Sequence, residues 1–302
     1  MSVENIIKKS IKKNIGAVPL EVSKLGNGAC GSVYKVECEK IGTVALKISE
    51  HVSLMEKEYK MLSYLREKTE SKIPKVHYFD REEQFGIIAM EYIDGIGGGD
   101  ERVKSISDKE RLANSIVDNL IAIQSARSDK FGPYDDPTFD TWYEYYKSFA
   151  DEIYTFSKEK RAEGAFGDNV MRAVELSFGL FDTIYGEEDF RPTLIHGDYW
   201  MSNFIIDEKN GVLLSVVDPF NVMWADPEYE LFALDVGYGI ELGLYDLYKK
   251  KVKTTKYCDV KLELYALYSE VLWYKTLGSI DHSFLSMRAD RLMNVMERFK
   301  LI

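Results

Sequence analysis

The stretch Leu194–Asp218, which reads LIHGDYWMSNFIIDEKNGVLLSVVD, is the part of the sequence that decides the fold. It predicts a strand, then a tight loop over residues 197–202, then a β-hairpin. The arms of the hairpin are Phe204–Asp207 and Val212–Asp218, and the pair Asn210-Gly211 supplies the positive-φ turn between them. This arrangement gathers polar side chains at one end of the hairpin.

Three of those polar residues, Asp198, Asn203 and Asp218, form a candidate catalytic set. Asp198 is spaced to accept a proton from an attacking hydroxyl group. Asn203 and Asp218 offer the hard oxygen ligands that Mg²⁺ prefers, and Mg²⁺ needs few protein ligands where substrate phosphates supply the others. The two aspartates also have simpler structural explanations, because Gly-Asp is a common turn pair and Asp218 precedes Pro219 at the end of a strand.

A glycine-rich motif, Gly26-Asn27-Gly28-Ala29-Cys30-Gly31-Ser32-Val33, lies near the N-terminus. The pattern G-x-G-x-x-G-x-V resembles one that joins a strand to a helix in dinucleotide-binding folds. Here strands are predicted on both sides, over residues 20–25 and 33–38, because the second segment alternates and is rich in β-branched and aromatic residues. This context favours a hairpin flap whose backbone amides, around Gly26, Gly28, Gly31 and Val33, cover phosphates. A plain glycine-rich hairpin is the simpler alternative.

The next predicted strand, Val44-Ala45-Leu46-Lys47, carries a candidate phosphate-binding lysine. Strand alternation puts Val44, Leu46 and Ile48 on one face and Ala45 with Lys47 on the other. The small Ala45 leaves room for a nucleotide base, and the Lys47 ammonium would meet the α- and β-phosphates. A single lysine on a strand is otherwise most often a solvated residue.

The helix that follows offers two possible partners for Lys47. Ser53 and Glu56 form a capping-box pattern, which assigns Glu56 to the N-terminus of the helix. Glu58 shares a helix face with Leu54, Leu62 and Leu65, and a carboxylate within an apolar stripe is costly unless it is paired. Glu58 is therefore the first candidate, and Glu56 is the second.

The remaining sequence predicts two more strands and then mostly helices. The strands cover residues 73–78 and 85–91, and we interpret Gly95–Gly99 as a flexible loop. A helix is expected from about Ser107, where Ser107 and Glu110 form a capping-box pattern before the apolar stripe Leu112, Ile116, Leu120 and Ile123. Further helices are expected over residues 138–165, which are rich in aromatic core residues, and over residues 169–185, 229–250, 261–275 and 283–300.

Composition excludes some classes of function. Residues 1–95 contain 15 Lys and Arg against 14 Asp and Glu, whereas the remainder contains 24 against 36. A basic nucleic-acid-binding face is therefore not expected. The acidic second part would attract a cationic substrate, or it only keeps the protein soluble. No uncharged apolar run approaches the ~20 residues of a membrane span, so no membrane partner is expected.

The N-terminus and the cysteines indicate a cytoplasmic protein. The first residues, MSVENIIKKSIKKNIG, lack the apolar core of a secretion signal and predict a surface helix with Ile6, Ile7, Ile11 and Ile15 on one side. The cysteines Cys30, Cys38 and Cys258 are odd in number and have no close metal-ligand spacing. They favour a reducing compartment and no zinc site.

Taken in order, these motifs resemble the aminoglycoside phosphotransferase branch of the kinase-like superfamily, which includes choline kinases and fructosamine kinases. The resemblance covers nearly the whole chain. It implies an α+β, protein-kinase-like fold of two lobes: an N-terminal antiparallel sheet lobe that binds the nucleotide, residues 1–92, and a larger helical lobe for catalysis and the acceptor, residues 93–302. It also implies that Asp198 is the catalytic base, that Asn203 and Asp218 bind Mg²⁺, and that Lys47 and Glu58 position the phosphates. The backbone of Glu91 and Tyr92 would hydrogen-bond adenine.

The resemblance leaves the acceptor open. Trp200, Asp218-Pro219 and residues 226–234 look similar to fructosamine kinases, in which an Asp usually replaces Glu230. No Ala-Pro-Glu and no long activation segment follow Asp218, so small molecules are favoured over protein substrates. We expect transfer of the γ-phosphoryl group of ATP or GTP to a hydroxyl of a small, amine-bearing acceptor. An aminoglycoside is the first candidate and a fructosamine the second; an inactive nucleotide-binding module is the third reading.

Three acidic residues that follow the catalytic stretch, Asp226, Glu228 and Glu230, are candidates for contact with such a cationic acceptor. We expect some of them to lie within reach of the acceptor pocket, where carboxylates would bind and steer an amine. The alternative is that they only solvate the protein or cap the helix predicted from about Tyr229.

Overall fold

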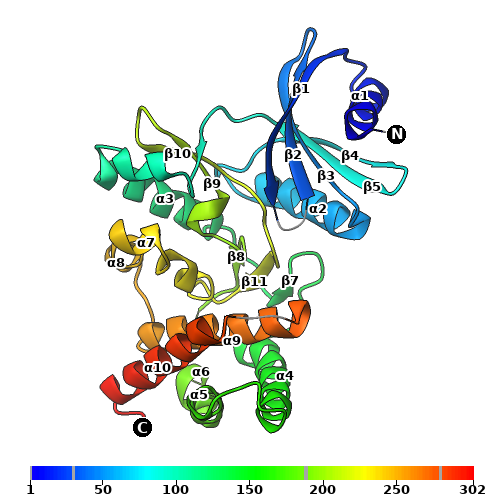
Figure 1. Cartoon of the computed structure of the whole chain (residues 1–302). Helices are drawn as coiled ribbons and strands as arrows, with labels where there is room; N and C mark the ends of the chain where they lie inside the picture. Colours follow the sequence, from blue (N-terminus) through cyan, green and yellow to red (C-terminus); the bar gives the residue numbers. More distant parts are fainter. Residues whose placement is uncertain (1, 29–30, 187–189, 279–280) are drawn as a thin grey trace. The chain divides into compact units, whose positions relative to one another are not determined.

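The computed structural model describes residues 2–28, 31–186, 190–278 and 281–302 (Figure 1). The chain forms two compact units. The first contains the residues up to Ile123 together with Asp198–Phe220, and the second contains Gln124–Gly197 together with Asn221–Ile302. The lobe boundary predicted after Tyr92 falls within the first unit, which continues to Ile123 and also includes Asp198–Phe220. Among the described residues, no helix combines the length and the apolar character that crossing a bilayer requires.

A five-stranded antiparallel sheet organises the first unit, with the strand order β1-β2-β3-β5-β4. The strands are β1 (Pro19–Gly28), β2 (Gly31–Cys38), β3 (Gly42–Ser49), β4 (Val76–Glu82) and β5 (Phe85–Glu91). This sheet was expected, and β5 has the predicted bounds. The strand predicted over residues 73–78 begins only at Val76, because Pro74 has no amide hydrogen to donate to a neighbouring strand.

Helices α1 (Val3–Asn14) and α2 (Val52–Lys68) cover opposite faces of this sheet (Figure 1). On one face, the α1 residues Ile6, Ile7 and Ile11 share a buried cluster with Val44, Leu46 and Ile48 of β3, as strand alternation predicts. On the other face, α2 buries Met55, Met61, Leu62 and Leu65.

Two predictions about the start of α2 are wrong. The helix begins at Val52, and the residue before it, His51, makes no capping hydrogen bond through its side chain. Ser53 therefore lies inside the first turn, and Glu56 forms ion pairs with Lys60 and Arg81. Leu54 is 42% exposed, since the apolar stripe of α2 passes through Met55 instead.

Polar contacts fasten α1 to strand β4. The carboxylate of Asp80, which is only 7% exposed, accepts hydrogen bonds from Ser10 Oγ at 2.8 Å, Lys13 Nζ at 2.7 Å and Asn14 Nδ2 at 2.7 Å. Burial alone would raise the pKa of Asp80, but these three donors hold that pKa below its ordinary value. Asp80 therefore stabilises the docked helix while its carboxylate is ionised.

We expect Asp80→Ala to lower the free energy of unfolding by roughly 1–3 kcal/mol at neutral pH, because the buried Ser10 hydroxyl and two more exposed donors lose their acceptor. A carboxyl whose pKa is lower in the folded state stabilises above its unfolded-state pKa and loses that effect as the pH falls through its folded-state pKa. The difference between wild type and variant should therefore shrink in acid. Denaturant unfolding of the wild type and the variant, at neutral pH and in acid, measures this difference in the free energy of unfolding. Glu56→Ala, which removes the ion pairs with Lys60 and Arg81 on the surface, is the control, and an equal loss of stability there would contradict the role of Asp80.

The hairpin predicted after the loop over residues 197–202 is present in the first unit. Its arms are β9 (Phe204–Asp207) and β10 (Val212–Val216). Of the pair Asn210-Gly211, only Gly211 has a positive φ, +58°, because the Asp207 carboxylate accepts the amides of Lys209 and Asn210 and tightens the turn.

The segment interpreted as a flexible glycine loop has defined structure. It forms strand β6 (Ile96–Gly97), which pairs with β9, and is followed by the 3-10 helix η1 (Glu101–Ser105). Gly98 lies so close to the carbonyl of Met201 that a Cβ atom would clash with it. The glycine is therefore required by this close approach, and the prediction of a flexible linker was wrong.

Helix α3 (Lys109–Ile123) packs beside β10 in the first unit. Its predicted apolar stripe, Leu112, Ile116, Leu120 and Ile123, is buried. The helix cap differs from the prediction, because Asp108, and not Ser107, accepts a hydrogen bond in the first turn, from the amide of Arg111 at 2.9 Å.

The second unit combines a small antiparallel sheet with most of the helices. The sheet has the order β7-β11-β8, formed by β7 (Gly132–Pro133), β11 (Met223–Ala225) and β8 (Thr193–Ile195). Helix α4 (Trp142–Ala162) begins with a capping box between Thr141 and Glu144. Its aromatic residues belong to the core cluster or pack against it, as predicted.

Two long predicted helices are interrupted in this unit. The segment 169–185 divides at Leu180 into α5 (Asp168–Gly179) and α6 (Phe181–Tyr185). The segment 229–250 forms η3 (Leu231–Leu234), α7 (Tyr238–Glu241) and α8 (Leu244–Lys251), because Gly237 and Gly243 have positive φ angles that an α-helix does not contain. The last two helices, α9 (Cys258–Leu277) and α10 (His282–Arg298), were predicted.

Candidate active site

A buried lysine between two carboxylates lies at the centre of the first unit. Lys47 Nζ, on β3, donates to Glu58 Oε1 at 3.0 Å and Oε2 at 2.8 Å, and to Asp218 Oδ1 at 2.8 Å. Lys47 and Glu58 are 4% and 6% exposed. Of the two glutamates considered for this pair, Glu58 is therefore the partner, and Glu56 faces Lys60 and Arg81.

Two carboxylates facing one ammonium leave an excess of negative charge in this cluster. Burial, reinforced by Asp218, raises the pKa of Glu58 to about 7 although Lys47 lowers it. Burial alone would lower the pKa of Lys47, but Glu58 and Asp218 together raise it above its ordinary value. The lysine stays protonated, and the cluster would be stabilised by an additional cation.

The loop over residues 197–202 brings Asp198 and Asn203 together. Asn203 Nδ2 donates to the Asp198 carbonyl at 2.8 Å and to Asp198 Oδ2 at 2.6 Å. The Asn203 carbonyl accepts the amide of Val217, the residue before Asp218, at 2.9 Å. Burial raises the pKa of Asp198 to about 6, opposed by the hydrogen bond from Asn203 and assisted by the charge of Asp218. Asp198, Asn203 and Asp218 therefore form one connected set in the first unit.

Tyr199 anchors this loop, and this role of Tyr199 was not predicted from the sequence. Its side chain is fully buried, and its hydroxyl donates to the Ile116 carbonyl of α3 at 2.8 Å and accepts from Asn119 Nδ2 at 3.1 Å. The only signal in the sequence was an aromatic residue directly beside Asp198.

Glu230 supports the chain on the other side of the same loop, within the second unit. Its carboxylate accepts the backbone amides of His196 at 3.3 Å and Gly197 at 2.9 Å, and the residue is 2% exposed. The side chain that we expected near a substrate therefore positions the backbone that leads into Asp198.

The other two acidic residues of that prediction, Asp226 and Glu228, also bind partners in the interior of the second unit. Asp226 is fully buried and accepts from Lys261 Nζ at 2.7 Å and the Tyr265 hydroxyl at 2.7 Å. Glu228 accepts from the Thr255 hydroxyl at 2.8 Å and pairs with Lys261 at 2.6 Å. The prediction that these carboxylates form a charged surface for an acceptor is wrong, because all three are at most 2% exposed and accept hydrogen bonds from groups of the protein itself.

The glycine-rich motif forms the end of the β1–β2 hairpin, where Gly28 lies opposite Gly31. Ala29 and Cys30 lie outside the described residues. A Cβ atom on Gly31 would come within 2.6 Å of the Ile48 carbonyl, whereas on Gly26 and Gly28 it would meet no atom of the described residues closer than 3.8 Å. Packing within the chain therefore explains the glycine at position 31 alone.

The remaining predicted nucleotide contacts lie on the same sheet. Val33 of β2 pairs with Lys47 of β3, and Ala45, which is also on β3, is buried. The backbone amide of Glu91 already donates to the Lys75 carbonyl at 2.8 Å. The adenine of a nucleotide would therefore have to form hydrogen bonds with other backbone groups near Glu91 and Tyr92. The Tyr92 ring lies beside Lys35, with 5.4 Å between Nζ and the ring centroid.

Comparison with solved structures identifies the fold. The chain is similar to a proposed fructosamine-3-kinase from Thermobifida fusca YX-ER1, with 19% identity, coverage of 96% of this chain and 99% of that one, and a TM-score of 0.72. It is also similar to a thermostable mutant of aminoglycoside phosphotransferase APH(4)-Ia in a ternary complex with AMP-PNP and hygromycin B, with 16% identity, coverage of 95% and 97%, and a TM-score of 0.70. The predicted kinase-like α+β fold is confirmed.

Sequence comparison gives the family. No curated protein sequence matches this chain significantly. The model of the phosphotransferase enzyme family matches residues 21–240, a range that includes the glycine-rich motif, Lys47, Glu58 and the loop over residues 197–202. The chain therefore belongs to the phosphotransferase enzyme family.

Proposed function

We propose that this protein transfers the γ-phosphoryl group of ATP or GTP to a hydroxyl group of a small-molecule acceptor. The observation that carries the proposal is the cluster in the first unit, where Lys47 contacts both Glu58 and Asp218 while Asn203 holds Asp198. Membership of the phosphotransferase family and the AMP-PNP complex of a similar structure support a nucleotide as the phosphoryl donor.

The residues fit a nucleotide with Mg²⁺. Asn203 uses its amide nitrogen on Asp198, and its Oδ1 accepts from no donor in the described part of the chain. That oxygen and the Asp218 carboxylate, which is 43% exposed, would hold the ion. When bound, Mg²⁺ supplies positive charge to the β- and γ-phosphates. In the described part of the hairpin, no side chain fills the space beside Gly26 and Gly28, which supports a flap whose backbone covers phosphates.

Each of the remaining groups has a defined task in this proposal. Asp198 accepts the proton of the acceptor hydroxyl, and Asn203 orients the carboxylate that receives it. Lys47 binds the α- and β-phosphates, and Glu58 holds the lysine in place. Residues 1–92, with Ala45, Val33, Gly31 and the backbone near Tyr92, bind the nucleotide, and residues 93–302 supply the catalytic loop and the acceptor site.

The acceptor is an amine-bearing alcohol in this proposal, either an aminoglycoside or a fructosamine. A screen that measures ADP or GDP release over aminoglycosides, glycated amines, choline and neutral sugars tests both the activity and the acceptor. Turnover with an amine-bearing acceptor supports the proposal. Nucleotide binding without turnover of any acceptor favours an inactive nucleotide-binding module, whereas preference for a neutral sugar contradicts the amine.

The pair Lys47 and Glu58 gives a separate prediction. We expect Lys47→Ala to weaken nucleotide binding or turnover and Glu58→Ala to produce a milder form of the same defect. Because the two side chains act as one unit, the double variant should resemble Lys47→Ala alone. Kinetics of all three variants give the coupling free energy. Glu56→Ala, whose side chain faces away from Lys47, is the matched control, and independent effects of Lys47→Ala and Glu58→Ala would contradict the pairing.

A further inference from the structure

The residues that follow helix α2, residues 69–73, form a short linker that is bound to the last turn of that helix. The Arg66 side chain donates to the Ile73 carbonyl at 2.5 Å. The Thr69 hydroxyl donates to a carbonyl in the last turn of α2 at 2.8 Å. The linker is therefore a rigid extension of α2, the helix that carries Glu58.

Lys72, within this linker, binds strand β10 through both its backbone and its side chain. Its carbonyl accepts the Val216 amide at 2.8 Å and the Ser215 hydroxyl at 3.2 Å. Its ammonium group donates to the Leu213 carbonyl. Because β10 leads directly to Asp218, these bonds hold α2 at a fixed separation from the segment that carries this carboxylate.

Asn119 of helix α3 completes the link. Its side chain is only 4% exposed, and its Oδ1 accepts the Lys72 amide at 2.5 Å while its Nδ2 donates to the Tyr199 hydroxyl at 3.1 Å. The Tyr199 hydroxyl already donates its own proton to the Ile116 carbonyl. A side chain at position 119 must therefore offer an acceptor and a donor at once, which Asn does and Asp or an apolar residue does not.

The partners of Asn119 indicate more than the satisfaction of a buried amide, which needs partners wherever it lies. One partner belongs to the linker of α2, and the other directly follows Asp198 in the chain. Lys47 contacts Glu58 of α2 and Asp218 after β10, each at 2.8 Å. The geometry of this ion pair cluster therefore depends on how α2 is held beside β10.

We propose that Asn119 is a positioning residue that acts through Lys72. It holds α2 at the separation from β10 at which Lys47 can contact both of its carboxylate partners. The consequence for nucleotide binding rests on the proposed phosphotransferase function, whereas the effect on the ion pair cluster does not.

Chemical labelling of Lys47 tests this without any nucleotide. The full-length protein reacts with acetic anhydride, and mass spectrometry of its peptides gives the acetylation rate of each lysine. Lys47 is 4% exposed and held by two carboxylates, so it should react slowly in the wild type. In Asn119→Ala its rate should rise at least about fivefold, as for a local opening that follows the loss of a buried hydrogen bond. An unchanged rate would overturn the proposal.

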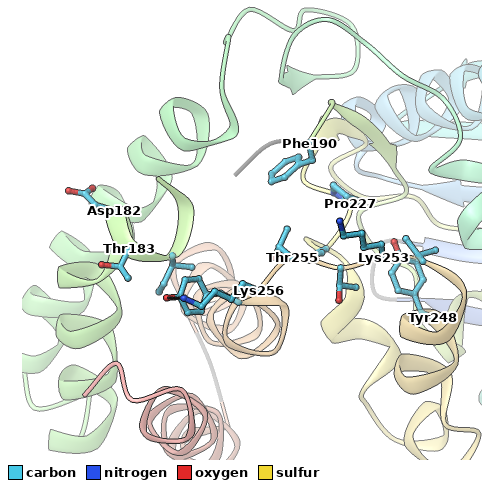
Figure 2. A pocket seen from close by; sticks show the side chains of 13 residues that line it. Asp182, Thr183, Phe190, Pro227, Tyr248, Lys253, Thr255 and Lys256 are labelled. Atoms are coloured by element: carbon cyan, nitrogen blue, oxygen red, sulfur yellow. Dashed lines mark hydrogen bonds between the residues drawn. The ribbon is translucent and has the colours of Figure 1, made fainter. Parts of the chain in front are cut away.

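Other side chains separate a local opening from general unfolding. Lys261 is fully buried in the second unit, and Cys38 is buried in the first sheet against α1. Acetylation of Lys261 and alkylation of Cys38 by iodoacetamide should keep their wild-type rates. Lys253, which is exposed and borders a cavity of about 720 Å³ (Figure 2), reports the amount of active reagent. A parallel rise at Lys47, Lys261 and Cys38 would show only a loss of stability and would refute positioning.

The matched control is Asn114→Ala, a partly exposed residue on the same helix whose amide donates to the Glu110 carbonyl at 2.9 Å. It should leave the acetylation rate of Lys47 unchanged. Ser215→Ala removes one of the two hydrogen bonds to the linker carbonyl and should raise that rate by a smaller factor than Asn119→Ala. It provides the same test if Asn119→Ala does not fold, and the absence of any rise would then count against the proposal.

Calorimetric titration with ADP and Mg²⁺ connects the link to nucleotide binding. Asn119→Ala should weaken ADP binding at least about threefold, but should have no further effect where Glu58→Ala is already present, because coupled residues are not additive. An equal loss in both backgrounds would contradict an action through Glu58. If the wild type does not bind ADP, the proposed function fails, while the labelling experiment still decides the role of Asn119.

Discussion

Replacing Asp198 with Asn is expected to reduce turnover by roughly 10²–10⁴-fold, the range for loss of a positioned base. The amide of Asn is nearly the same size and can still accept from Asn203 Nδ2, which bonds Asp198 Oδ2 at 2.6 Å in the wild type. It cannot take up the proton that the attacking hydroxyl loses. Nucleotide affinity should stay close to that of the wild type, because Lys47, Glu58 and Asp218 are unchanged. Steady-state kinetics give the turnover, and calorimetry gives the nucleotide dissociation constant.

The control for this variant is Asp207→Asn, the same chemical change a few residues later. Asp207 caps the exposed hairpin turn through the amides of Lys209 and Asn210 and makes no contact with Asp198. Its turnover should stay within about twofold of the wild type, because surface changes away from a site are nearly neutral. An Asp198→Asn enzyme that keeps most of its activity would remove Asp198 from the role of base. A parallel loss in both variants would show that the hairpin, and not the carboxylate, is responsible.

The ion pair of Lys47 could be predicted because burying a charge has a large cost. A glutamate among leucines on a helix requires a cationic partner. Lys47 on β3, the strand that precedes the helix in the chain, is that partner. The same periodicity was less reliable for the helix itself, since Leu54 is exposed and Met55 is buried. Helical spacing identifies which residues share a face, but it does not tell where along the helix the covering sheet begins.

The contacts of Asp226, Glu228 and Glu230 could not be predicted for a related reason. Their charges are visible in the sequence, but their partners are not. Lys261 lies on α9, well along the chain, and the partners of Glu230 are backbone amides that every sequence contains. Acidic residues that seemed to form a charged substrate wall are therefore part of the interior.

The expectation with the second largest effect concerns Asp218, whose carboxylate we propose as a Mg²⁺ ligand. Asp218→Asn should weaken binding of the Mg²⁺–nucleotide complex by at least about a hundredfold, since loss of even an outer contact to a metal ligand costs 10–100-fold in metal affinity. Nucleotide affinity measured in EDTA should change much less, because Lys47 keeps Glu58 as a partner. Calorimetric titration with ADP, with and without Mg²⁺, measures both quantities for the wild type and the variant.

Asn is the informative replacement because of the backbone at this position. Asp218 has a positive φ of 57°, which Asn tolerates as well as Asp and which would strain Ala. The change therefore removes charge without disturbing the turn before Pro219. If Asp218 served only that turn, Asn would be neutral both with and without Mg²⁺, and unchanged affinity for the Mg²⁺–nucleotide complex would favour that purely structural role. A loss confined to the titration with Mg²⁺ distinguishes a metal ligand from a turn residue, because only a metal ligand makes the effect depend on the ion.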